Sequence, residues 1–150
     1  MFKALVLICF LTIVGGCSTH TQSSEPVSYP LGTIYSSVES NLTMGIQSYS
    51  ENRREITSRP FIVKQSEKSK KSGLHERGRA TVTILGEARP YTIETKVAIE
   101  RSEDPGDPNS TEYEFTRYDQ GLATKLLRNI LSTLDKSNRN KNVIDDFRSF

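Results

Sequence analysis

Residues 79–101 read RATVTILGEARPYTIETKVAIER, and this stretch decides the fold. Small or apolar side chains alternate with polar ones over residues 79–84 and again over 91–99. A period of two places one set of side chains in a core and the other in solvent, as in a half-buried strand. Residues 86–90 between the two runs contain glycine and proline, which favour a turn. The stretch therefore predicts an antiparallel β-hairpin.

Amphipathic helices are predicted on both sides of this hairpin. Over residues 33–49, apolar side chains recur every three or four positions, which is the spacing of one helix face. Residues 120–136 carry a longer apolar stripe. Asp119 precedes this stripe and is suited to be its N-cap, because a carboxylate accepts hydrogen bonds from the free N–H groups of a first turn.

Two shorter strands complete the predicted domain. Residues 56–63 are rich in β-branched and aromatic side chains but contain Pro60, so we expect an edge strand. Tyr113 and Phe115 alternate with polar residues and predict a fourth strand. The expected fold class is α+β, with element order α-β-β-β-β-α. We expect a four-stranded antiparallel meander sheet with two helices on one face, forming a single domain over residues 31–150.

The first 18 residues have the organisation of an export signal. Lys3 supplies a positive start, and residues 4–14 form an apolar run that is too short to span a bilayer, which needs about 20 residues. The run ends in Val14-Gly15-Gly16-Cys17. This motif resembles the lipobox of bacterial lipoprotein precursors. The resemblance implies that residues 1–16 are a signal peptide that is removed, and that Cys17 carries a covalent lipid.

The lipobox resemblance also implies a location. By the sorting rules of enterobacterial lipoproteins, Ser18 after the cysteine favours the outer membrane, with the domain facing the periplasm. The inner membrane and the cell surface remain alternatives. An ordinary secretory signal, or an uncleaved anchor with a coincidental cysteine, is the alternative to the lipobox itself. Residues 17–30 are rich in Ser and Thr, and we predict that they comprise the lipidated cysteine and a flexible tether.

Composition limits the classes of partner and cofactor. Lys and Arg total 20 against 18 Asp and Glu, so the net charge of +2 gives no argument for nucleic acid. The two cysteines are Cys9 and Cys17. If the first is removed and the second carries lipid, no disulfide forms. We expect no cofactor apart from the lipid on Cys17.

The sequence offers little to an enzyme or a metal ion. His75 is the one imidazole beyond the predicted tether, and no His and Cys cluster provides zinc ligands. Asp145 and Asp146 are adjacent, so their side chains point apart and do not form an acid and base pair. An acidic loop has calcium-type oxygens, but its prolines and glycine explain it as a turn (Asp104, Asp107, Asn109, Glu112). We expect no catalytic site and no metal site.

One local electrostatic feature stands out within residues 64–79. This segment contains six cationic residues and two acidic ones, Glu67 and Glu76, so its net charge is 6 − 2 = +4. Such a cluster is suited to anionic lipid headgroups, lipopolysaccharide phosphates or an acidic partner protein. The alternative is a solvated loop that lysine keeps soluble. The candidate anion-binding or partner-binding residues are Lys64, Lys68, Lys70, Lys71, Arg77 and Arg79.

These observations favour a non-enzymatic binding or assembly factor of the bacterial envelope, held to a membrane by its lipid anchor. The expected partner is an envelope protein or an anionic glycolipid. The predicted order of elements beside a lipid anchor is similar to that of small envelope lipoproteins, including the one that plugs the lipopolysaccharide export barrel. The alternatives are a cell-wall-associated hydrolase and a surface-exposed structural lipoprotein.

Overall fold

The computed structural model describes residues 20–63, 75–102 and 112–147, which form an α+β fold. Two helices and one antiparallel sheet of seven strands lie in these ranges. The helices are α1 (Leu31–Asn41) and α3 (Gln120–Phe147). The strands are β1 (Gln22–Ser23), β2 (Ile46–Tyr49), β3 (Glu55–Ser58), β4 (Phe61–Ile62), β5 (Glu76–Leu85), β6 (Thr92–Ser102) and β7 (Tyr113–Tyr118).

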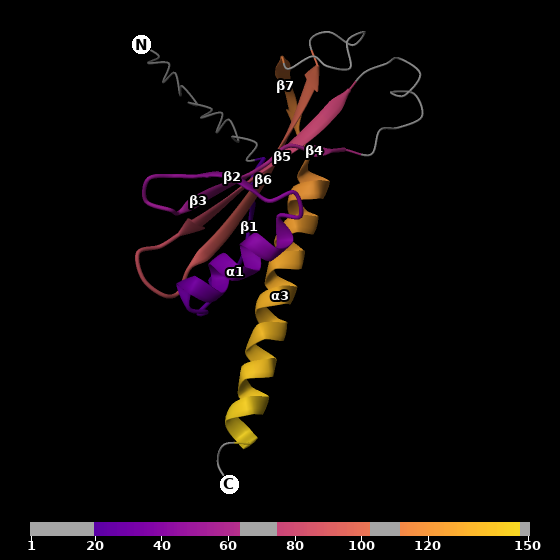
Figure 1. The fold of residues 1–150 in the computed structure, drawn as a ribbon. Coiled ribbons are helices and arrows are strands. Elements are labelled where there is room, and N and C mark those ends of the chain that lie inside the picture. The colour runs from indigo at the N-terminus through magenta and orange to yellow at the C-terminus, as the bar shows by residue number, and fades with distance from the viewer. Residues whose placement is uncertain (1–19, 64–74, 103–111, 148–150) are drawn as a thin grey trace, which may run out of the picture.

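The predicted hairpin is confirmed and lies at the centre of the sheet. β5 and β6 pair in an unbroken antiparallel register from Glu76↔Arg101 to Leu85↔Thr92. On the far edge of β5, β3 and β4 pair one after the other. On the far edge of β6, β1 and β7 pair one after the other. β2 pairs with β3 and extends the sheet on that side. Figure 1 shows that β5 and β6 run the length of the sheet, so the shorter strands are placed by this hairpin.

One face of the sheet carries the core. Every second residue over most of β5 and β6 is buried, and α1 and α3 pack against this face and against each other (Figure 1). The Thr95 hydroxyl donates to the Ala123 carbonyl at 2.9 Å and joins β6 to α3. The Asn41 amide donates to Thr133 Oγ1 at 3.0 Å and joins the helices. The shared core comprises Ile34, Val38, Leu42, Ile56, Ala80, Val82, Ile84, Tyr91, Ile93, Val97, Ile99, Ala123, Leu127, Ile130 and Leu134.

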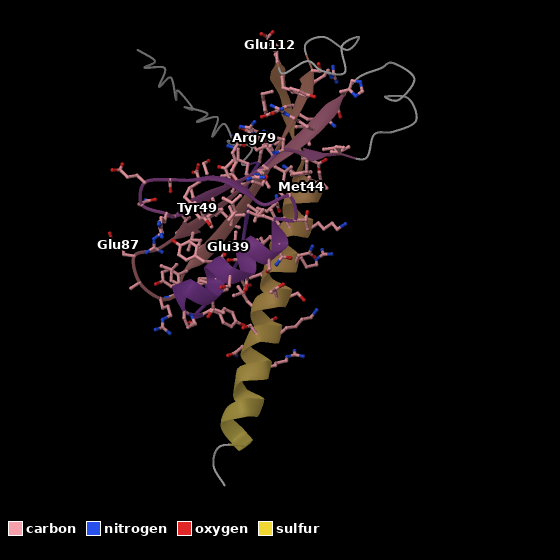
Figure 2. The ribbon with its side chains drawn as sticks, viewed as in Figure 1. Glu39, Met44, Tyr49, Arg79, Glu87 and Glu112 are labelled. Atoms are coloured by element: carbon pink, nitrogen blue, oxygen red, sulfur yellow. The ribbon has the colours of Figure 1, made fainter. Side chains whose placement is uncertain are left out.

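The helix predicted over residues 33–49 is wrong in its second half. α1 ends at Asn41, and Gly45 has a φ of +81°, in the left-handed region that glycine adopts at little cost. The chain then enters β2, whose Tyr49 hydroxyl donates to Glu39 of α1 at 2.9 Å (Figure 2). Pairing with β3 supplies backbone hydrogen bonds that override the helical spacing of the apolar residues.

The second predicted helix is confirmed and extends further. Asp119 Oδ1 accepts from the Leu122 N–H at 2.9 Å, as expected of an N-cap. The predicted end near residue 136 is wrong, because α3 continues to Phe147. Asn and Lys after residue 136 weaken the apolar stripe but do not stop a helix in the way that glycine or proline does.

The predicted four-stranded meander is also incorrect, because the described residues form seven strands. The predicted strand over residues 56–63 divides at Arg59-Pro60 into β3 and β4. At this break the Ser58 hydroxyl oxygen accepts from the Ala80 N–H of β5 at 2.9 Å. Proline has no N–H for a ladder, so a side chain satisfies the buried donor that the break leaves on β5.

Part of the predicted flexible tether is paired with the sheet. Within residues 17–30, β1 pairs with β6, and the Val27 N–H donates to the Tyr91 carbonyl at 2.7 Å. Serine and threonine suggested a linker, but the free edge of β6 offers backbone partners. The predicted signal peptide and Cys17 lie outside the described residues. In the part of the chain that the structure describes, neither helix is long and apolar enough to cross a membrane.

The bond from Ser58 to Ala80 provides a test of the broken strand. Because Ser58→Ala leaves a buried N–H without its acceptor, we expect the free energy of unfolding to fall by about 2 kcal/mol. Chemical denaturation measures this loss. Ser48→Ala, on the exposed part of β2, is the matched control and should change stability by under about 0.5 kcal/mol. Equal effects of the two substitutions would contradict the assigned role of Ser58.

Candidate functional site

The structure describes only two residues of the predicted basic cluster, Arg77 and Arg79. Four of its members, Lys64, Lys68, Lys70 and Lys71, lie outside the described residues. Arg77 and Arg79 are paired with the same carboxylate of Glu100, with Nε to oxygen distances of 2.7 Å and 3.3 Å. The Arg77 guanidinium also lies 3.7 Å from the ring centroid of Tyr113. These two cations are therefore already engaged within the sheet.

A second ion cluster braces the end of the sheet that extends past the beginning of α3 (Figure 1). Glu76 of β5 accepts from both terminal nitrogens of Arg117 in β7, at 3.0 Å and 3.1 Å, and from Arg101 of β6 at 3.2 Å. The Glu76 side chain is only 9% exposed. Hydrogen bonds from Arg117, and then from Arg101, hold the pKa of Glu76 below its ordinary value of 4.5. This cluster ties three strands together.

The described histidines lie apart from any catalytic or metal-binding group. His75 is exposed, next to the first residue of β5, and its carbonyl accepts from the Ser102 N–H. His20 stacks on Tyr118 with ring centroids 5.0 Å apart. In the described ranges no group of three or more His, Cys, Asp or Glu side chains is placed to hold a metal ion. The predicted acidic turn lies outside these ranges except for Glu112, and the side chains of Asp145 and Asp146 are not described.

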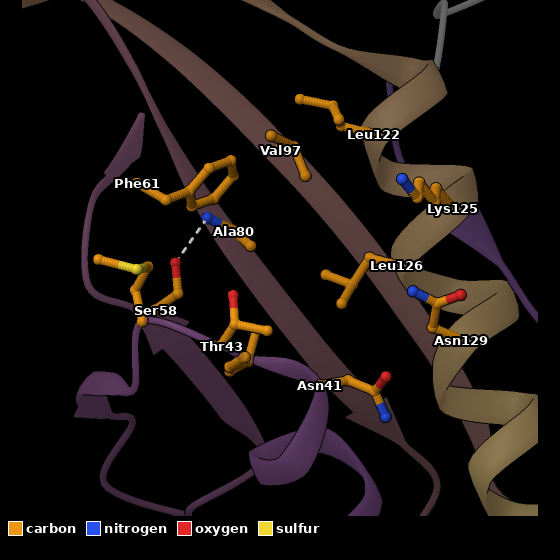
Figure 3. A pocket seen from close by; sticks show the side chains of 12 residues that line it. Asn41, Thr43, Ser58, Phe61, Ala80, Val97, Leu122, Lys125, Leu126 and Asn129 are labelled. Carbon is orange, nitrogen blue, oxygen red and sulfur yellow. Dashed lines mark hydrogen bonds between the residues drawn. The ribbon is translucent and has the colours of Figure 1, made fainter. Parts of the chain in front are cut away.

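A groove on the helix-bearing face is the strongest candidate for a binding site. It lies between the end of α1, the β4 segment and the first half of α3, over β5 and β6 (Figure 3). Its volume is about 280 Å³, near the lower end of ligand pockets. We call it the α1–α3 groove. Its lining residues are Asn41, Leu42, Thr43, Met44, Ser58, Phe61, Ala80, Val97, Leu122, Lys125, Leu126 and Asn129.

The floor of the α1–α3 groove is apolar. Phe61 and Leu126 face each other across Ala80 and Val97, with Leu122 above them (Figure 3). Ser58 also lies there, but its oxygen already accepts from Ala80 N, as the dashed line marks. The Ser58 oxygen is therefore engaged, and Thr43 contributes a second hydroxyl to the lining. Met44 at the edge is 53% exposed, and its flexible thioether adapts to varied apolar shapes.

The mouth of the groove is polar and carries one charge. Asn41 and Asn129 contribute amides, and Lys125 is the single charged residue of the described lining. No Asp, Glu, His or Cys is among these lining residues. The electrostatic field at the mouth is therefore positive and unopposed by any carboxylate of the lining.

Gly78 fixes the position of the wall that Phe61 forms. The two residues are register partners in the β4–β5 pairing. A Cβ at position 78 would lie 2.5 Å from Cε2 of Phe61, which is closer than van der Waals contact permits. The absence of a side chain at Gly78 leaves the space beside β5 that the Phe61 ring occupies.

Two other hollows are less suited to a specific ligand. One, of about 220 Å³ on the sheet face away from the helices, has Glu55, Glu94 and Lys96 among its lining residues. The other lies beside the β2–β3 and β5–β6 turns and includes Arg54, Glu55 and Glu87. In each, two carboxylates face one cation, so both hollows are net negative and less suited to an anionic ligand than the α1–α3 groove.

Sequence reasoning missed the α1–α3 groove because its residues read as core positions. Leu122 and Leu126 belong to the apolar stripe of α3 but are only partly buried. The structure shows a mismatch in helix length, since an 11-residue helix cannot cover a 28-residue partner and the whole sheet face, whereas the predicted ranges 33–49 and 120–136 are equal in length. The predicted helix was too long at its C-terminal end, residue 49, and this error hid the mismatch.

The chain matches no protein-family model, no curated protein and no solved structure. The case for a function therefore rests on the groove and on the surfaces of the sheet.

The contact between Gly78 and Phe61 can be tested by a double-mutant cycle. We expect Gly78→Ala alone to lower the free energy of unfolding by about 2 kcal/mol, because the added methyl displaces the ring. In a Phe61→Ala background the same change should cost under about 0.5 kcal/mol. Chemical denaturation of the four chains gives the coupling. An equal cost in both backgrounds would show that the ring does not constrain position 78.

Low pH should weaken the ion pairs that Glu76 forms with Arg101 and Arg117. The pKa of Glu76 is lowered in the folded chain, so its contribution is complete above the ordinary value of 4.5 and is lost as pH falls through the lower folded value. We expect Glu76→Gln to lower the free energy of unfolding by about 2 kcal/mol at neutral pH, and by progressively less in acid. Denaturation across the pH range measures this. Glu114→Gln on exposed β7 is the control, and a pH-independent loss for Glu76→Gln would contradict the assignment.

Proposed function

We propose that this protein is a lipid-anchored, non-enzymatic binding protein of the bacterial envelope that holds an amphiphile in the α1–α3 groove. The apolar chain of the amphiphile lies on the groove floor, and its anionic head lies beside Lys125. The anchor is the lipid on Cys17 that the lipobox implies. The proposed ligand belongs to the anionic glycolipid class expected from the sequence, but it binds at the groove rather than at the basic cluster.

The observation that carries the proposal is the combination of an apolar floor with a single cation at the mouth. Burial of a methylene group contributes about 0.8 kcal/mol, so even a short segment of acyl chain on this floor binds measurably. The volume of about 280 Å³ suits one chain segment better than a bulky ring system. Lys125 presents a compact ammonium that favours a phosphate or carboxylate over a neutral head.

The lining chemistry favours binding over catalysis. Hydrolysis of a cell-wall bond requires a positioned acid and base or an activated nucleophile. The described lining has no carboxylate, imidazole or thiol, and exposed His75 lies outside it. A cell-wall hydrolase therefore finds no support in this groove.

The strand edges favour a groove ligand over a partner protein that adds a strand. β2 is four residues long, and its pairing with β3 shifts register between Ile46 and Ser48. The pairing of β7 with β6 shifts register between Ile99 and Glu100. Short and irregular edges are poor templates for an added strand. Among the described surfaces, the groove is the better candidate for recognition.

Photocrosslinking in intact cells tests this function without removing the anchor. A benzophenone amino acid at position 126 is expected to yield an adduct in which the peptide around residue 126, separated from the lipidated Cys17, incorporates both labelled acetate and labelled phosphate. The same group at Ser132, on the exposed side of α3, is the positional control. Mass spectrometry of the purified adduct identifies the attached species. A polypeptide adduct, or equal lipid labelling at both positions, would exclude the proposed occupant.

Substitution of Lys125 tests the charge at the mouth. We expect Lys125→Ala to reduce the adduct yield at position 126 about fivefold, the equivalent of about 1 kcal/mol for one cation beside an anionic head. Arg128→Ala is the matched control, because Arg128 is exposed on the same helix but does not line the groove. Equal yields from the two variants would remove the assigned role of Lys125.

A further inference from the structure

The sheet face away from the helices has an exposed apolar and cationic end. Register places Ile62, Arg77, Glu100 and Phe115 in one row across β4, β5, β6 and β7. Arg77 alternates with the buried positions of β5, so this row lies on the face opposite the core. Ile62 is 89% exposed and Phe115 is 56% exposed. Two large apolar side chains thus flank an arginine on one open surface.

Aromatic rings and a lysine continue this surface toward the beginning of the described chain. The Tyr118 ring lies between two others, with its centroid 4.7 Å from that of Phe115 and 5.0 Å from that of His20. Lys96 Nζ lies 4.5 Å from the Tyr118 ring centroid. Three cations lie on this face among the exposed rings, together with the carboxylate of Glu100, which pairs with two of them, and that of Glu94, two residues from Lys96 on the same side of β6. These cations are Arg77, Arg79 and Lys96.

The attachment point brings this surface close to a membrane. His20 is three residues after Cys17, and three extended residues span at most about 11 Å. The polar layer of a bilayer is itself roughly 5–8 Å thick on each side. A domain attached this closely stands at most a few ångströms clear of the headgroups, and the part nearest to them is the surface around His20.

We infer that His20, Ile62, Arg77, Lys96, Phe115 and Tyr118 form a membrane-facing surface that lies on the headgroup layer of the anchoring membrane. This inference rests on the proposed lipid attachment at Cys17. Tyrosine and phenylalanine are suited to the boundary between headgroups and acyl chains. Lys96, beside the Tyr118 ring, complements anionic headgroups. The short link and the surface together orient the domain with its helices away from the bilayer.

Tryptophan fluorescence tests this orientation, because the chain contains no tryptophan. The full-length lipoprotein is reconstituted in vesicles of phosphatidylethanolamine and phosphatidylglycerol, part of which carries bromine on the acyl chains. Phe115→Trp and Ile62→Trp report on the proposed surface. Ser132→Trp, exposed on α3, is the matched control. All three sites are solvent-exposed, so the substitutions should leave the fold intact.

We expect brominated lipid to quench the fluorescence of Phe115→Trp and Ile62→Trp at least about twofold more than that of Ser132→Trp, since bromine quenches only at close range. Lipid attachment is measured separately, from the mass of the N-terminal peptide and from flotation with the vesicles. A chain that carries the lipid and floats, but shows equal quenching in all three variants, overturns the membrane-facing surface alone. A chain without the diacylglyceryl mass overturns the proposed anchor as well.

Discussion

β5 and β6 pair in an unbroken antiparallel register from Glu76↔Arg101 to Leu85↔Thr92, and alternate residues of both strands are buried on one side. This one-sided burial governs the rest of the molecule. A half-apolar sheet must be covered on one face only, and two helices from opposite ends of the domain provide the cover. Because α1 has 11 residues and α3 has 28, the cover is uneven. The α1–α3 groove and the ion-paired end of the sheet are where the helices leave the sheet face incompletely covered.

Sequence reasoning predicted those elements whose periodicity extends over many residues. The hairpin alternates over two long runs, and α3 has both an apolar stripe and an N-cap in Asp119. β1 has two residues within the predicted tether, where no periodicity indicates a strand, and β4 was predicted only as the end of the longer strand over residues 56–63. They form because the long edges of β5 and β6 offer unpaired backbone groups. Their existence depends on the fold around them rather than on local sequence.

The candidate site was less predictable than the fold, for a physical reason. A sequence permits charges to be counted, but the count does not identify their partners. Arg77 and Arg79 were predicted as two of six anion-binding or partner-binding residues, and in the structure both pair with Glu100 of the neighbouring strand. The groove has no motif at all. It follows from the unequal lengths of two helices and from Gly78, whose missing side chain lets Phe61 form a wall.

The two proposed surfaces lie on opposite faces of one sheet, and this arrangement constrains how the protein would work. Val97 lines the groove while its neighbour Lys96 belongs to the membrane-facing surface, and successive strand residues point to opposite sides. With one face on the anchoring bilayer, the groove opens away from that bilayer. An amphiphile in the groove would then have left its membrane or come from another carrier, and its exposed head would be available to a partner. At about 0.8 kcal/mol per buried methylene, the proposed anchor would hold the domain more firmly than the groove would hold a short chain segment. The proposed ligand would therefore exchange while the protein stays attached.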